Sequence, residues 1–166
     1  MTNYWLFLVD YFRIKGWKGV VKTLVVPMVL TLAVAFVNDW SVGGGAWADM
    51  KGTSIDVLGI LMGFLISATA LVATSNNESI ERAKGYDINV KSWGKKKYLY
   101  DELVAEIVWC TTCCALSIMG IVAASMAGMS DVWLFYIAMF SMSYCVFASM
   151  EMVLDMYQIF SSNRGQ

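Results

Sequence analysis

Residues 56–75 read "DVLGILMGFLISATALVATS", and this stretch decides the fold class. After Asp56 it contains no charged residue. A run of about 20 apolar residues can cross a hydrocarbon layer about 30 Å thick. The whole chain has the same character, because 58% of its 166 residues are hydrophobic and only 15% are charged, which is too apolar for a soluble core. The stretch therefore predicts a membrane-spanning helix over about 55–74.

Three further apolar runs on either side of this stretch predict membrane-spanning helices over 23–37, 103–125 and 132–157. Pro27 is tolerated in the first turn or two of the first helix. We expect an all-α fold: one integral membrane domain, 1–166, built as a bundle of four transmembrane helices.

The basic residues indicate the orientation of this bundle. Cytoplasmic connections of membrane proteins carry an excess of lysine and arginine. Here the basic residues gather before the first span, in the 76–102 link and after the fourth span, whereas Lys51 alone lies on the other side. We therefore expect both termini and the link in the cytoplasm, and the 43–45 loop and the 126–131 turn outside.

The first 22 residues do not have the pattern of a signal peptide, because their apolar part is short and their basic residues follow it. Aromatic and basic side chains alternate here, which suits a helix lying at the membrane interface over 1–22. The alternative is a cytoplasmic extension of the first span.

The 76–102 link is the one sizeable segment outside the spans. Glu78 and Arg82 are four residues apart, which favours a continuation of the second helix until Gly85 stops it, and Asp101 can cap the third helix. An aromatic and basic group in the link can contact lipid headgroups or a partner protein, and we expect no direct contact with nucleic acid. The group consists of Lys91, Trp93, Lys95, Lys96 and Lys97.

Three carboxylates are expected at one depth near the cytoplasmic end of the bundle: Glu106, Glu151 and Asp155. Such an acid ring can form a cation-attracting vestibule or an acidic docking surface for a basic partner. The plainer interpretation is a set of solvated interfacial carboxylates, some of them paired with Lys22 or Lys97.

Small residues recur every four positions in the second span, at Gly59, Gly63 and Ser67. A row of this kind lets two helix backbones approach closely. We expect it at the centre of the bundle or at a seam between subunits of a homo-oligomer, for which we guess a tetramer.

The residue types argue against catalysis. Histidine is absent, which removes the commonest general base and metal ligand. Cys110, Cys113 and Cys114 share one face of the third helix and Cys145 lies at a similar depth, but a single helix rarely aims three ligands at one ion. We predict no catalytic residue, no metal site and no cofactor, with packing between helices as the role of the thiols.

The four-span layout, the charged link and the stretch "GFLISATALVATSNNESIERAK" at residues 63–84 resemble the small membrane subunits of bacterial anti-phage systems. The nearest family is KwaA, the membrane subunit of the Kiwa system. The resemblance implies an oligomeric protein of the bacterial inner membrane that senses phage-induced membrane disturbance and works with a cytoplasmic DNA-binding partner. It carries no catalytic motif and transfers no residue roles.

These observations favour a non-enzymatic membrane sensor or scaffold that recruits a soluble partner through its cytoplasmic surface. The alternative is an oligomeric pore that depolarises the membrane, with the acid ring as a cation filter. A membrane enzyme ranks third, because no nucleophile and base pair supports it.

Overall fold

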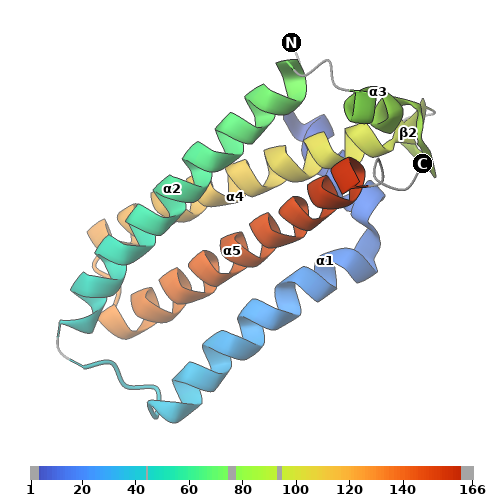
Figure 1. Ribbon diagram of the computed structural model, residues 1–166. Helices are drawn as coiled ribbons and strands as arrows, with labels where there is room; N and C mark the ends of the chain where they lie inside the picture. The colour runs from blue at the N-terminus through green and yellow to red at the C-terminus, as the bar shows by residue number, and fades with distance from the viewer. Residues whose placement is uncertain (1–3, 44, 75–77, 93–94, 162–166) are drawn as a thin grey trace.

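The computed structural model describes the backbone of residues 4–43, 45–74, 78–92 and 95–161. Four long helices run side by side: α1 (Tyr4–Val37), α2 (Ala46–Thr74), α4 (Leu99–Met126) and α5 (Asp131–Ser161). A short helix α3 (Glu78–Gly85) and the strands β1 (Asp87–Ser92) and β2 (Lys95–Tyr98) gather at one end of this bundle (Figure 1). The α1–α2 and α4–α5 connections lie at the opposite end.

Four segments of the described chain are long and apolar enough to cross a membrane: Gly19–Val37, Ala46–Thr74, Leu99–Met126 and Asp131–Tyr157. Their mean hydropathies lie between 1.6 and 2.3. This confirms the predicted set of four long apolar helices. The segments begin from one to nine residues earlier than the sequence predicted, because polar residues of the interface continue each helix beyond its apolar run.

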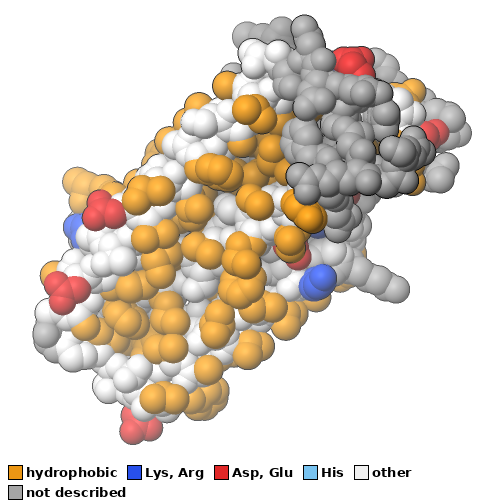
Figure 2. Space-filling view, viewed as in Figure 1, with side chains coloured by type: hydrophobic (Ala, Val, Ile, Leu, Met, Phe, Trp, Pro, Cys, Tyr) orange, Lys and Arg blue, Asp and Glu red, His pale blue; other side chains and the backbone are white. Residues whose placement is uncertain are grey.

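The surface of the bundle is apolar. Ile60 is 74% exposed and Phe36 is 69% exposed, and hydrophobic side chains cover much of the flank visible in Figure 2. Water would penalise an apolar surface of this extent, whereas lipid tails would not. The surface therefore fits a multi-pass membrane protein.

The core lies where α2, α4 and α5 meet. Leu58 and Leu65 of α2, Ile107 and Ile121 of α4, and Met152 of α5 are almost completely buried there. Helix α1 packs mainly against α4 and α5. α1 is therefore a peripheral helix attached to a three-helix core.

Helix α1 bends at Gly16, where the backbone has φ 67° and ψ 165° (Figure 1). Glycine adopts this conformation readily, whereas a residue with a Cβ is strained in it. The bend separates residues 4–15 from the apolar segment Gly19–Val37. Pro27 lies well inside the apolar segment rather than at the start of a helix, and it is buried.

The 76–102 link contains a feature that the sequence did not predict. Strands β1 and β2 pair antiparallel, with Ser92 opposite Lys95 and Lys91 opposite Lys96, so a small hairpin accompanies the otherwise helical fold. The strands are only six and four residues long. β2 (KKKY) is almost entirely basic, and β1 (DINVKS) has only Ile88 and Val90 as alternating apolar residues, too few for sequence periodicity to reveal a strand. Gly85 ends a helix, as expected, but that helix is the separate α3 and not a continuation of α2, which ends at Thr74. Asp101 supports the start of α4 by accepting a hydrogen bond from the Tyr98 backbone N–H (3.0 Å).

Candidate functional site: a carboxylate cluster around Lys15

The most polar site of the described bundle centres on Lys15, one residue before the bend in α1. Its ammonium forms an ion pair with Glu106 Oε1 of α4. It also lies 3.5 Å from Asp155 Oδ2 and 3.8 Å from Glu151 Oε2 of α5. Residues from three helices therefore meet at one point, which we call the Lys15 cluster: Lys15, Glu106, Glu151 and Asp155.

Burial increases from one side of the cluster to the other. The side chain of Asp155 is 36% exposed and that of Glu151 is 28% exposed, but that of Glu106 is only 5% exposed. The second oxygen of Glu106, Oε2, is buried without a hydrogen-bond partner. Glu106 is thus the innermost member of the cluster, and one of its oxygens is unsatisfied.

Glu151 has a second partner on α1. The Thr23 hydroxyl donates a hydrogen bond to Glu151 Oε2 at 2.7 Å. Because Thr23 lies two turns beyond Lys15, both sides of the α1 bend hold the same carboxylate of α5. The cluster therefore holds α1 in place on both sides of its bend, in addition to pairing Lys15 with the carboxylates.

Lys15 remains charged in this environment. Burial alone would lower the pKa of its amine, but the ion pair and hydrogen bond with Glu106, followed by the charges of Asp155 and Glu151, raise the pKa above its usual 10.5. The ammonium therefore supplies one lasting positive charge to three carboxyl groups.

An aromatic stack attaches residues 4–15 to the bundle beside the cluster. The Tyr11 ring stacks on Trp109 of α4 with centroids 4.8 Å apart, and Phe12 meets the same indole edge-on. Trp109 Nε1 in turn donates a hydrogen bond to the Tyr144 hydroxyl of α5 (2.8 Å). Tyr11 is 4% exposed, so the segment before the bend is packed onto protein at this residue.

The structure brings the three predicted acids together. It adds Lys15 at their centre, which the sequence placed only among the basic residues of the interface. The missed signal is the spacing of two glycines after Lys15. Gly16 lets the helix bend, and Gly19, four positions after the lysine, leaves room for the lysine side chain.

The other predicted site residues are distributed differently. Lys91 lies in β1 and Lys95–Lys97 lie in β2, but their side chains, and Trp93 entirely, are outside the described residues. Gly59, Gly63 and Ser67 lie on the exposed side of α2, and a Cβ at either glycine would meet nothing within 4 Å. The position at the bundle centre is thus wrong, because α2 turns Leu58 and Leu65 inward instead.

The thiols of Cys110, Cys113, Cys114 and Cys145 are free, and Cys114 and Cys145 are completely buried between α4 and α5. Within the described residues no group of three or more Cys, Asp or Glu side chains is arranged to hold a metal ion. The cluster can hold charge and protons and can join α1 to the core.

Comparisons of the chain with models of known protein families, with curated proteins and with solved structures give no significant match. The functional inference therefore depends on the Lys15 cluster and on the unequal ends of the bundle.

Proposed function

We propose that the chain is a non-enzymatic sensor or scaffold of the bacterial inner membrane. It assembles as a homo-oligomer, and the end of its bundle that carries α3 and the hairpin lies in the cytoplasm and engages a soluble partner. The observation that carries the proposal is the inequality of the two ends: the Lys15 cluster, α3 and the hairpin share one end, and the other has only short connections.

Charge supports the orientation. The end that carries α3 also holds nearly all the lysine and arginine residues of the chain, and Lys51 belongs to the opposite end. Basic connections stay in the cytoplasm during membrane insertion. The same end is therefore the one that soluble proteins of the cell can reach.

Assembly is supported by the outer face of α2. Gly59, Gly63 and Ser67 leave a shallow strip on the lipid side, where a second helix backbone could approach closely. The neighbouring Ile60 and Phe64 are exposed and would gain contacts from a second subunit. We infer that this strip is the subunit seam.

Sensing is supported by the way α1 is attached. Residues 4–15 are held by the Lys15 cluster and by the Tyr11–Trp109 stack, while the bend at Gly16 allows them to change direction. Packed helix interfaces tend to switch between discrete arrangements rather than deform continuously. A disturbance of the bilayer could therefore release this attachment and change the cytoplasmic surface.

The anti-phage setting and the DNA-binding partner follow from the resemblance to the Kiwa membrane subunits alone. The pore remains the alternative. Against it, the three acids of the proposed filter face the ammonium of Lys15, which would repel a passing cation.

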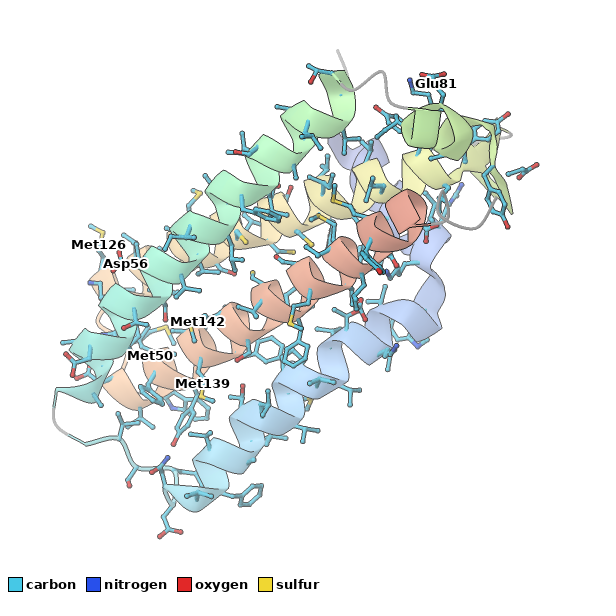
Figure 3. The ribbon with its side chains drawn as sticks, viewed as in Figure 1. Met50, Asp56, Glu81, Met126, Met139 and Met142 are labelled. Carbon is cyan, nitrogen blue, oxygen red and sulfur yellow. The ribbon has the colours of Figure 1, made fainter. Side chains whose placement is uncertain are left out.

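Photo-crosslinking in living cells tests the partner. A photoreactive amino acid at Glu81, exposed on α3, is expected to capture a soluble protein, and the same probe at Asp56 of α2 is the control. Figure 3 labels both residues, at opposite ends of the bundle. Capture of the same soluble protein from both positions, or from neither, would contradict the proposal.

Reconstitution in anionic vesicles separates the scaffold from the pore. The full chain is expected to form oligomers without conducting ions. A current that Glu106→Gln and Glu151→Gln both abolish would establish the pore and reject the scaffold.

A further inference from the structure

We propose that Glu106 and Asp155 bind one exchangeable proton between them, so that the Lys15 cluster is a proton-binding site inside the bundle. This inference is independent of the proposed sensor or scaffold function, because it concerns only the charge state of the cluster.

The first step is the number of charges. Three carboxyl groups lie at ion-pair distance from the single ammonium of Lys15. With all three ionised the cluster would carry two uncompensated negative charges, one of them on a side chain that is only 5% exposed. Burial of an unpaired charge is costly, and buried groups usually neutralise instead. One added proton removes half of the excess.

The second step is the unsatisfied oxygen. Glu106 Oε1 is paired with Lys15, whereas Oε2 is buried without a partner. Asp155 Oδ2 lies 3.5 Å from the same ammonium, so the two carboxyl groups are close neighbours around Lys15. Two ionised carboxylates only accept hydrogen bonds, so a bond between them can form only when one of them carries a proton. A proton on Oε2 would make this buried oxygen a hydrogen-bond donor instead of an unsatisfied acceptor.

The third step is the choice of a proton over a metal ion. The ammonium of Lys15 already occupies the space between the carboxylates, and a second full cation there would be repelled. The arrangement of the described carboxylates also does not suit a metal ion. A proton instead converts one carboxylate into a donor and leaves Lys15 in place.

Other charged or titratable side chains lie around the pair, on each helix packed against it. Those described are Tyr11 and Lys15 of α1, Glu102 and Cys110 of α4, and Glu151 of α5. Among these neighbours Lys15 alone is positive, and Glu102 and Glu151 add negative charge.

Infrared spectroscopy of the purified full chain in lipid nanodiscs tests this directly. At about pH 6, where a free glutamate is ionised, the wild type is expected to show the carbonyl stretch of one protonated carboxyl, which shifts in deuterated water and disappears at higher pH. Glu106→Gln and Asp155→Asn are each expected to abolish it. The control Glu81→Gln, in an exposed pair with Lys84, is expected to keep it.

Glu106→Gln mimics the neutral state and should fold, and Asp155→Asn offers a second, more exposed position if it does not. Absence of the band in the wild type at that pH would overturn the proposal. So would a band that persists in both variants. If the band is absent and added sodium or magnesium ions raise the melting temperature of the wild type but not of Glu106→Gln, the cluster is a metal-cation site and the proton assignment is wrong.

Discussion

The Tyr11 ring lies parallel to the Trp109 indole, with their planes 8° apart, and Trp109 hydrogen-bonds to Tyr144. Three helices are therefore joined by one row of aromatic side chains. The row begins on the far side of the Gly16 bend, so the position of residues 4–15 is linked to the packing between α4 and α5.

Tyr144→Phe is expected to weaken this row. The substitution keeps the ring but removes the hydroxyl that accepts the hydrogen bond from Trp109 Nε1. An indole N–H left without a partner in a low-dielectric site costs about 1–3 kcal/mol. The melting temperature in mild detergent should fall. Tyr157→Phe is the matched control, because Tyr157 is 68% exposed on the same helix. An equal effect of the two substitutions would show that the hydrogen bond has no special role.

Lys15→Met is expected to be among the most damaging single changes outside the core. It leaves Glu106 and Asp155 facing each other without a cation, and removal of one partner of a buried pair costs about 3–5 kcal/mol. The partial exposure of Lys15 places the expected loss at the lower end of that range. A reversible unfolding titration with sodium dodecyl sulfate would measure it.

The double variant Lys15→Met with Glu106→Gln is expected to recover part of this loss, because no unpaired charge then remains at the inner position. A double-mutant cycle gives the coupling between the two residues. Additive effects would show that the two side chains do not interact.

The pH dependence of the Lys15 contribution follows from the raised pKa of this amine. The folded state holds the lysine proton more tightly than the unfolded chain does, so stabilisation is fully present below the usual 10.5 and is lost as the pH rises through the raised pKa. The Lys15 contribution is the difference in unfolding free energy between the wild type and Lys15→Met, measured with sodium dodecyl sulfate as above. We expect that loss of the Lys15 proton does not lower this difference between about pH 8 and pH 10. A steep decline across that interval would mean that Lys15 is not held by the carboxylates.

The sequence was sufficient for the four apolar helices, because a single property, the length of each uncharged run, decides them. It was also sufficient to expect Glu106, Glu151 and Asp155 at one level, since helix rise converts residue number into depth. It could not identify Lys15 as their partner. That contact depends on the direction of α1 after Gly16, and the backbone angle of one glycine is not encoded in a hydropathy pattern.

The orientation of α2 was also beyond the sequence. Gly59 and Gly63 predict that another helix packs closely against α2, but they do not tell whether that helix belongs to the same chain. The face of α2 that packs against the other helices of the bundle is the one that carries Leu58 and Leu65. The link was harder still, because its hairpin is short and its basic side chains are equally typical of a lipid anchor.

Gly16→Ala tests the bend itself. A Cβ at position 16 would meet no atom within 4 Å, so any loss of stability comes from the backbone conformation alone. A non-glycine residue with φ 67° and ψ 165° is strained by about 1–3 kcal/mol. A melting temperature lower than that of the wild type is expected. Gly43→Ala is the control, since it has open space and an ordinary φ. If Gly16→Ala were as stable as the control, the bend would not require glycine.

Gly19→Ala is expected to disturb the Lys15 cluster from outside it. A Cβ at position 19 would lie 2.7 Å from Lys15 Cγ, which is near the root of that side chain and cannot simply swing away. The lysine stem must therefore move, and its ammonium with it, so the ion pairs with Asp155 and Glu151 should lengthen. Gly120→Ala, also in a helix but with open space around the added carbon, provides the control. Alanine normally stabilises a helix relative to glycine by roughly 0.5–1 kcal/mol, so the control should be at least as stable as the wild type while Gly19→Ala should be less stable. The decisive measurement repeats both substitutions in a Lys15→Ala background, whose side chain ends at Cβ. There the penalty of Gly19→Ala should vanish, because no Cγ remains at position 15 to be displaced, and a penalty that persists would place its origin elsewhere in α1.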